Sequence, residues 1–181
     1  MAGIDENRTF LPLNVAVLTV SDTRTEDDDR SGNLLRERAL SAGHVLVEKR
    51  ILPDTEETLV TQLRAWIADP GVDVVLATGG TGLTGRDVTP EAFEAVYEKA
   101  IPGFGELFRH LSFAKIGTST IQSRATGGVA NGTYLFALPG SPSACKDAWD
   151  EILVYQLDVR YRPCNFVEII PRLRETLGRG Q

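Results

Sequence analysis

One stretch of the chain decides the fold, and it reads Ala77-Thr78-Gly79-Gly80-Thr81-Gly82-Leu83-Thr84-Gly85-Arg86-Asp87-Val88-Thr89-Pro90. An apolar run over residues 72–77 leads into it, so a buried strand is followed by four glycines within seven residues. An Arg-Asp pair and then a helical pattern come next. Glycine allows positive φ and has no Cβ, which suits backbone N–H groups that approach a phosphate. The stretch therefore predicts a phosphate-binding turn, and the acid beside it indicates a metal-bound phosphate.

The same stretch partly matches two nucleotide-binding motifs. Gly80 to Gly85 has the spacing of a P-loop, but Arg86 and Asp87 stand where Lys and Ser or Thr are required, so that interpretation fails. Residues 80–85 also match the fingerprint G-x-G-x-x-G. The helix, however, begins only near Thr89, and no acid ends a strand about 20 residues further on. An NAD-binding oxidoreductase stays open as a less favoured alternative.

Length and composition indicate one ordinary soluble domain. The chain has 181 residues, of which 42% are hydrophobic and 24% charged, and this is enough for a single core. Its net charge of -6 argues against broad nucleic-acid binding. No apolar run approaches the ~20 residues that span a bilayer, and residues 1–10 do not look like a signal segment. We therefore expect a cytoplasmic protein with no nucleic-acid or membrane partner.

The two cysteines and two histidines form no metal or catalytic motif. Cys145 lies in a helical pattern and is expected in the core, and we expect no disulfide between Cys145 and Cys164 in a reducing compartment. His44 and His110 are too few for a zinc centre, and helix-end or surface positions are expected for both. No G-x-S-x-G elbow supports a serine hydrolase.

Alternating strand and helix patterns predict a parallel sheet. Strands are expected at 13–20, 44–52 and 72–77, and helices at 32–42, at 55–68 and at 90–99 with Thr89 as cap. A further helix should contain Leu107, Phe108 and Leu111, Asn131-Gly132 should close a hairpin over 126–138, and Ser141 should cap a last helix. The elements predict a three-layer α/β/α domain over residues 13–172, with a mostly parallel sheet and an antiparallel edge hairpin. A polar N-terminal tail (1–12) and a C-terminal tail (173–181) should flank it.

Four loops should meet at one edge of this sheet. Each follows a predicted strand: Ser21-Asp22, Pro53-Asp54, Gly79 to Asp87, and Pro139 to Pro142. Ligands of parallel α/β sheets bind beyond the carboxyl ends of the strands. The convergence of these loops therefore predicts a single active site.

Five segments, taken in order, resemble the molybdopterin-binding MoaB/Mog family of molybdenum cofactor biosynthesis. They are residues 19–22 (TVSD), 78–82 (TGGTG), 86–91 (RDVTPE), 102–106 (PGFGE) and 138–142 (LPGSP). The resemblance extends over residues 13–168, nearly the whole chain. Ser112-Phe113, Ser123-Arg124 and residues 162–166 make the chain most similar to the MoaB branch.

The resemblance implies a reaction, the transfer of AMP from Mg-ATP to the terminal phosphate of molybdopterin with release of pyrophosphate. Positioning and charge neutralisation carry such transfers, because the nucleophile is already an anion. By resemblance, Asp54 and Asp87 fall on acidic motifs tied to adenylyl transfer, and together they could bind Mg²⁺. Some MoaB-branch members lack one or both acids. This chain keeps both, which favours a molybdopterin adenylyltransferase over the alternative, a non-catalytic molybdopterin carrier.

The resemblance also implies the residues that line the pterin and nucleotide pockets: Ser21, Asp22, Thr78, Gly79, Gly80, Thr81, Gly82, Ser112, Ser123, Pro139, Gly140 and Ser141. Structural roles remain open for several candidates, because Asp54 can begin a turn, Asp87 can serve a helix dipole and Ser141 can be a cap alone. The family further implies a homo-oligomer, a trimer or a dimer of trimers, and a downstream molybdenum insertion protein as a partner.

Three other features remain, and two of them have two interpretations each. Arg24 and Arg124 are candidates for phosphate contacts or for solvated loop charges. The acidic run 26–29 is expected to be a mobile solvated loop. Phe104, Phe108 and Phe113 are candidates for an apolar interface or for the core.

Overall fold

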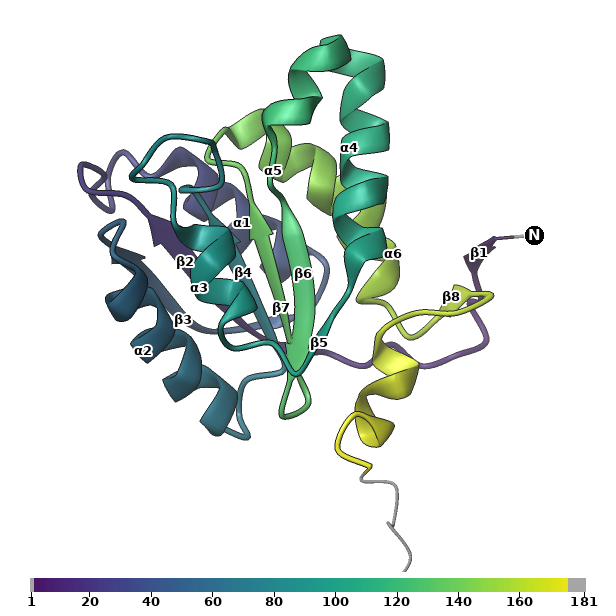
Figure 1. Ribbon diagram of the computed structural model, residues 1–181. Helices are drawn as coiled ribbons and strands as arrows, with labels where there is room; N and C mark the ends of the chain where they lie inside the picture. The colour runs from purple at the N-terminus through teal and green to yellow at the C-terminus, as the bar shows by residue number, and fades with distance from the viewer. Residues whose placement is uncertain (1, 176–181) are drawn as a thin grey trace, which may run out of the picture.

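Six strands form one mixed sheet in the computed structural model, which describes residues 2–175 (Figure 1). Their order across the sheet is β3-β2-β4-β7-β6-β5. The pairs β3–β2, β2–β4 and β4–β7 are parallel, whereas β7–β6 and β6–β5 are antiparallel. The predicted sheet, mostly parallel with an antiparallel hairpin near one edge, is thus confirmed. The strands are β2 (Asn14–Val20), β3 (Val45–Leu52), β4 (Val74–Thr78), β5 (Lys99–Ala100), β6 (Thr126–Ala130) and β7 (Thr133–Leu138).

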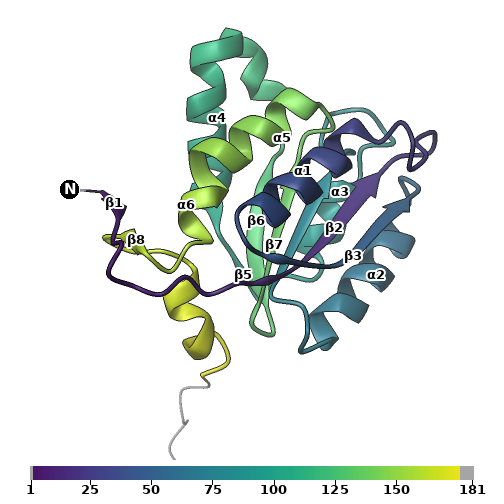
Figure 2. The same ribbon diagram turned by 180° about the vertical axis from the view of Figure 1, so that it is seen from behind.

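Helices cover both faces of the sheet, which confirms the three layers (Figures 1 and 2). One face carries α1 (Arg30–Ser41), α4 (Pro102–Ile116) and α5 (Pro142–Ala148). The other face carries α2 (Glu56–Ala68) and α3 (Thr89–Glu94). A 3-10 segment, η1 (Gly117–Gln122), follows α4. A π-helical segment, Trp149–Leu153, and α6 (Val154–Gln156) extend α5.

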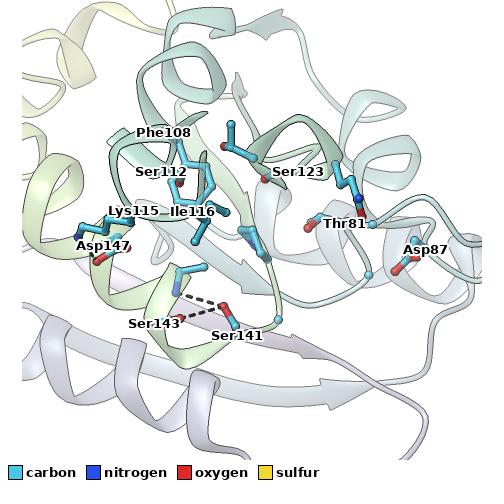
Figure 3. A pocket seen from close by; sticks show the side chains of 17 residues that line it. Thr81, Asp87, Phe108, Ser112, Lys115, Ile116, Ser123, Ser141, Ser143 and Asp147 are labelled. Carbon is cyan, nitrogen blue, oxygen red and sulfur yellow. Dashed lines mark hydrogen bonds and ion pairs between the residues drawn. The ribbon is translucent and has the colours of Figure 1, made fainter. Parts of the chain in front are cut away.

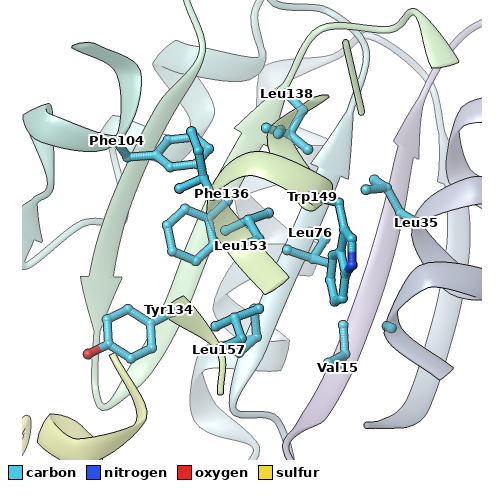
Figure 4. Packing of buried hydrophobic residues seen from close by; sticks show 14 of the residues in the cluster. Val15, Leu35, Leu76, Phe104, Tyr134, Phe136, Leu138, Trp149, Leu153 and Leu157 are labelled. Atoms are coloured by element: carbon cyan, nitrogen blue, oxygen red, sulfur yellow. The ribbon is translucent and has the colours of Figure 1, made fainter. Parts of the chain in front are cut away.

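The sheet separates two apolar cores, and β2 supplies both in alternation. Val15 and Val17 belong to the core under α1, α4 and α5, whereas Ala16 and Leu18 belong to the core under α2 and α3. Successive side chains of a strand point to opposite faces, so a strand covered on both sides must be apolar at nearly every position. The first core is drawn in Figure 4, and Trp149, Leu76 and Leu35 all belong to it.

The hairpin between β6 and β7 closes as the sequence predicts. Asn131 has φ 46° and Gly132 has φ 82°, so both central residues of the two-residue turn lie in the left-handed region. That combination matches the twist of paired strands and explains the Asn-Gly sequence.

Helix α3 differs from the prediction at both ends. It ends at Glu94 rather than Lys99, because the amide of Glu98 donates to the carbonyl of Val129 and Lys99 pairs with β6. Sheet pairing thus overrides the local helical pattern. The N-cap position is Val88 rather than Thr89, whose own amide donates to the carbonyl of Gly80 (3.0 Å).

Tertiary contacts bury two further residues, and for Asp29 this overturns the prediction. Asp29, expected in a solvated loop, is fully buried and accepts from the amide of Gly32 (2.9 Å), so α1 begins at Arg30. Thr19 Oγ1 and Lys49 Nζ each lie 2.7 Å from Asp29 Oδ2. His44 follows the end of α1 as expected but is only 5% exposed, since it packs between the rings of Phe10 and Trp149.

The first residues of the chain run along its C-terminal segment (Figure 2). Here β1 (Gly3–Ile4) pairs with β8 (Tyr161–Arg162), and the 3-10 segment η3 (Val167–Arg172) follows. Residues 176–181 of the predicted C-terminal tail lie outside the described residues. None of the helices within residues 2–175 is long and apolar enough to cross a membrane.

Candidate functional site

The predicted loops do gather at one edge, because neighbouring strands end at the same level. Thr78 pairs with Thr19 on one side and with Leu138 on the other, and Val20 pairs with Leu52. The residues that directly follow these strand ends are the loop residues that the sequence predicts at the site. This confirms that the four loops converge.

A cavity of about 470 Å³ lies between the glycine loop, α4 and the start of α5 (Figure 3). Many of the predicted site residues line it: Gly80, Thr81, Gly82, Asp87, Ser112, Ser123, Pro139, Gly140 and Ser141. The lining does not include Ser21, Asp22, Asp54, Thr78 or Gly79. The cavity therefore brings the glycine loop together with the serines of α4, of the segment after η1 and of α5.

Lys115 and Asp147 line the same cavity but are not among the residues that the sequence predicts. Lys115 Nζ lies 2.6 Å from Asp147 Oδ1, and this hydrogen bond raises the pKa of Lys115 above its ordinary value (Figure 3). Phe108, Ser112 and Lys115 follow each other at spacings of four and three residues, which places them on one face of α4. That helical spacing from Ser112 is the signal that could have found Lys115.

Ser141 is the cap that the sequence predicts. Its Oγ accepts from the amide of Ala144 (3.2 Å) and lies 3.4 Å from Ser143 Oγ, and Pro142 begins the helix. Both hydroxyls face the cavity (Figure 3). The Ser141 hydroxyl therefore caps α5 and lines the cavity at the same time.

Three glycines of the loop, Gly79, Gly80 and Gly82, are each required by a different neighbour. Gly79 and Gly80 have φ values of 105° and 62°, where glycine is favoured. A Cβ on Gly79 would overlap the carbonyl oxygen of Val20, whereas one on Gly82 would lie 2.8 Å from Asp87 Oδ2. A Cβ on Gly80 would overlap Thr89 Oγ1 and lie 2.6 Å from an oxygen of the Asp54 carboxylate. The side chains of Asp54, Asp87 and Thr89 therefore approach the bare backbone of Gly80 and Gly82.

Thr78 and Gly79 hold the loop to the sheet instead of lining the cavity. Thr78 is fully buried; its hydroxyl donates to the carbonyl of Pro139 (2.9 Å) and lies 3.1 Å from Cys145 Sγ. The amide of Gly79 donates to the carbonyl of Leu138 (3.0 Å). Burial raises the pKa of the Cys145 thiol to about 12, in keeping with the predicted core position.

Asp87 lies at the rim of the cavity and is fixed by its own loop. Its Oδ2 accepts from the hydroxyl (2.6 Å) and the amide (2.8 Å) of Thr84. The hydroxyl of Thr84 is the main reason why the pKa of Asp87 lies below its ordinary value. The carboxylate is therefore charged and held in place near neutral pH.

Arg124 fastens the glycine loop from the opposite side. Its Nε donates to the carbonyl of Gly82 (2.7 Å), and it also forms an ion pair with Glu91. The sequence leaves two interpretations open for Arg124, a phosphate contact or a solvated charge. The structure matches neither, because the guanidinium is engaged by other groups of the protein. Arg24, by contrast, is an exposed loop residue that pairs with Asp28.

Asp54 lies just outside the cavity lining, beside two other acids. Its amide donates to Asp22 Oδ1 (3.3 Å), and Asp22 forms an ion pair with Arg86. Partial burial raises the pKa of Asp54 above its ordinary value, and the negative charges of Asp22 and Asp87 raise it further. Ser21 and Asp22 line a separate, open hollow of about 650 Å³ that Arg24, Lys49 and Arg50 also line.

The donor set is limited but suits Mg²⁺ bound with a nucleotide. Within residues 2–175, no group of three or more His, Cys, Asp or Glu side chains is arranged to bind a metal ion. Mg²⁺ commonly takes only one or two carboxylates and completes its shell with phosphate oxygens and water. Asp54 and Asp87 supply two carboxylates from separate loops, and their mutual repulsion would be relieved by a cation.

Fold and site together define a class of protein. It is an α/β protein with a glycine loop, two acids and a serine-lined cavity beyond the carboxyl ends of parallel strands, where the ligands of such sheets bind. Residues 16–159 match the family described as a probable molybdopterin binding domain. The chain therefore belongs to the MoaB/Mog family of molybdenum cofactor biosynthesis proteins.

Individual relatives support this membership. The chain is 54% identical over 157 residues to molybdenum cofactor biosynthesis protein B of Escherichia coli, covering 87% of this chain and 92% of that protein. It is 43% identical over 158 residues to the protein of that name from Bacillus subtilis, covering 86% and 93%. The crystal structure of a molybdenum cofactor biosynthesis protein B matches with a TM-score of 0.80 at 41% identity, over 83% and 94% of the two chains. The tungsten cofactor synthesizing protein MoaB from Pyrococcus furiosus matches with a TM-score of 0.74 at 34% identity, over 91% and 98%.

Proposed function

We propose that this chain is a molybdopterin adenylyltransferase, which transfers AMP from Mg-ATP to the terminal phosphate of molybdopterin and releases pyrophosphate. One observation carries the proposal. The Asp54 and Asp87 carboxylates come from separate loops, and each approaches the side of a glycine, Gly80 or Gly82, where a Cβ would otherwise stand. A phosphate that approaches this loop would therefore meet backbone N–H groups and two carboxylates together.

The cavity suits molybdopterin, which combines a flat polar ring system with a phosphate. Phe108 and Ile116 offer apolar contacts, whereas Ser112, Ser123 and Lys115 offer hydrogen-bond donors. Lys115 would exchange part of its contact with Asp147 for a contact with the anionic ligand. The pterin phosphate would then point toward the glycine loop at the cavity rim.

The transfer needs no strong general base. An oxygen of the molybdopterin phosphate forms a bond to the α-phosphorus of ATP, and the bond from that phosphorus to the α–β bridging oxygen breaks. The electron pair leaves with pyrophosphate, and no proton has to move because the nucleophile is already an anion. The residues therefore act by orienting the two phosphates and by excluding alternative geometries.

Asp54 and Asp87 would hold Mg²⁺, which when bound supplies positive charge against the phosphate oxygens. The raised pKa of Asp54 supports this assignment, since burial and the neighbouring charges of Asp22 and Asp87 disfavour its charged form. A divalent cation would reverse that preference.

The test compares wild type with Asp87→Asn and with the matched control Asp27→Asn, an exposed acid in another loop. Each protein is incubated with molybdopterin and Mg-ATP, and adenylylated pterin is measured by chromatography. We expect product formation to fall by about 100-fold or more in Asp87→Asn and to be unchanged in the control. Pterin binding should persist in all three proteins. Normal turnover by Asp87→Asn would rule out this assignment.

A non-catalytic molybdopterin carrier is the second candidate, and one observation favours it. Asp87 Oδ2 already accepts two hydrogen bonds from Thr84, as a purely structural loop carboxylate would. A carrier would bind molybdopterin in the same cavity without any dependence on ATP or Mg²⁺. Pterin retained by wild type and Asp87→Asn, with no product from either, would identify it.

We also propose that the protein forms a trimer or a dimer of trimers and passes its product to a molybdenum insertion protein. Among the aromatic candidates for an interface, Phe104 and Phe108 belong to the core, whereas Phe113 is 57% exposed. Leu107 and Ile116 on the same helix are exposed too. Sedimentation analysis of wild type and Phe113→Ser would test assembly through α4.

A further inference from the structure

Thr89 carries a hydroxyl that the fold buries without a partner. The residue is fully buried at the start of α3, and its Oγ1 makes no hydrogen bond with any residue of the described chain, 2–175. Its amide is used, since it donates to the carbonyl of Gly80 (3.0 Å). Buried hydroxyls are almost always satisfied, so an unpaired one beside a ligand site calls for a functional explanation.

The carboxylate of Asp54 approaches Thr89 across the bare backbone of Gly80. A Cβ on Gly80 would overlap Thr89 Oγ1 and would lie 2.6 Å from Asp54 Oδ1. Both oxygens therefore approach the same point, the one that a side chain would occupy in any residue other than glycine. Gly80 leaves the space in which the hydroxyl and the carboxylate can meet.

The two groups are chemically complementary. The Asp54 carboxylate accepts no hydrogen bond from within residues 2–175, and its polar neighbours are the acids Asp22 and Asp87 and the guanidinium of Arg86, which pairs with Asp22. A hydrogen bond would stabilise the charged form of the Asp54 carboxylate, and the Thr89 hydroxyl beside it is a donor without a partner within residues 2–175. Carboxylates that bind a metal are typically oriented by a hydrogen bond of this kind.

We propose that Thr89 is a positioning residue for Asp54: its hydroxyl donates to the Asp54 carboxylate when magnesium nucleotide binds, and fixes which oxygen faces the cation. This inference rests on the proposed function only in so far as Asp54 holds Mg²⁺. Thr89 itself touches neither the nucleotide nor the pterin, because it is fully enclosed by protein.

The experiment uses Thr89→Val, which keeps the branched shape without the hydroxyl, and Thr89→Ser, which keeps the hydroxyl. Calorimetry measures Mg²⁺ binding in the presence of α,β-methylene-ATP, a nucleotide whose α–β bond is not cleaved. We expect Thr89→Val to weaken Mg²⁺ binding by about 10- to 100-fold and Thr89→Ser to restore most of it. The melting temperature of ligand-free Thr89→Val should equal or exceed that of wild type, because an unpaired buried hydroxyl has been removed.

Coupling to Asp54 is tested with Asp54→Asn alone and combined with Thr89→Val. If Thr89 acts through Asp54, adding Thr89→Val to Asp54→Asn produces little further loss of Mg²⁺ affinity. Wild-type affinity in Thr89→Val, or a lowered melting temperature that Thr89→Ser fails to restore, would overturn the inference. Wild-type Mg²⁺ affinity in Asp54→Asn would overturn it as well. A wild type that binds Mg²⁺ through Asp54 but forms no adenylylated pterin would contradict the proposed transferase and leave the role of Thr89 intact.

Discussion

The Nη2 atom of Arg124 lies 2.6 Å from the carbonyl oxygen of Asp87, so a residue that precedes β6 is fastened directly to the backbone of the acid in the glycine loop. The same guanidinium donates to the carbonyl of Gly82, and the amide of Arg124 donates to the carbonyl of Thr81 (3.2 Å). Three points of the loop are thereby tied to one residue. The shape of the loop depends on the fork of a guanidinium as much as on its glycines.

Arg124→Lys keeps the charge but removes the fork, and we expect it to loosen the loop. Adenylyl transfer should fall by about 10- to 100-fold, because a small misplacement of a positioning group is enough for such a loss. The free energy of unfolding should fall by about 1 kcal/mol as two part-buried carbonyl acceptors lose their donors. Arg172→Lys, in an exposed pair with Glu175, is the control and should change neither quantity. Unchanged transfer by Arg124→Lys would contradict the clamp.

Gly79→Ala should destabilise the fold strongly. The residue has φ 105°, and its new Cβ would overlap the carbonyl oxygen of Val20 on the neighbouring strand. Strain and overpacking together predict a loss of about 3 kcal/mol or more in chemical denaturation. Gly85→Ala in the same loop is the control, since its Cβ would meet nothing within 4 Å. Equal stability of the two variants would show that the backbone of Gly79 can relax.

Removing Lys49 should leave a charge uncompensated in the interior. Its side chain is 7% exposed and that of Asp29 is 0% exposed, with Nζ and Oδ2 2.7 Å apart. Lys49→Met should lower the free energy of unfolding by about 3–5 kcal/mol, and adding Asp29→Asn should recover part of it. Lys146→Met, which breaks an exposed pair with Asp150, should cost less than about 1 kcal/mol. A small effect of Lys49→Met would mean that water replaces the ammonium group.

His44 should make stability depend on pH on the acid side of neutrality. Burial lowers the pKa of His44 below its ordinary value, an effect that nearby Asp158 partly offsets. Its Nδ1 accepts from the amide of Leu13 (3.2 Å), which requires the neutral ring. As the pH falls below about 6.5, the unfolded chain binds a proton that the folded chain does not, so the free energy of unfolding decreases until the folded-state pKa is passed.

The control for this prediction is His44→Gln, which cannot titrate but keeps an acceptor. Denaturant titrations between about pH 7 and pH 5 should show a smaller decrease in stability for His44→Gln than for wild type. Parallel pH profiles would assign the decrease to carboxylates instead of His44.

Local patterns in the sequence predict most of the fold, because they are the patterns that decide it. Asn131-Gly132 specifies its own turn, and Ser141-Pro142 specifies the start of α5. Contacts between distant residues are not visible in this way. The end of α3 depends on pairing with Val129, and the burial of Asp29 depends on Lys49, twenty positions further along the chain.

In the candidate site, too, local sequence patterns predict some features, whereas contacts between distant residues determine the others. Strand ends and glycines predict where the loops gather, whereas Ser112 and Ser123 are implied only by the family resemblance. The sequence does not reveal that Arg124 contacts the loop backbone, because an arginine in a polar stretch looks like any solvated charge. Thr89 looks like an ordinary helix cap, and only the fold brings its hydroxyl next to Gly80 and Asp54.

Strands β2, β4 and β7 end at the same level, and this determines the spacing between the loops that follow them. Hydrogen-bonded strands lie about 4.8 Å apart whatever their side chains, so the lateral distances between the loops after Val20, Thr78 and Leu138 are multiples of a constant set by the peptide group. Substitution of side chains therefore leaves the spacing between neighbouring strands unchanged. Side chains can drift and loops can lengthen while the anchor points from which ligand-binding groups project keep the same spacing.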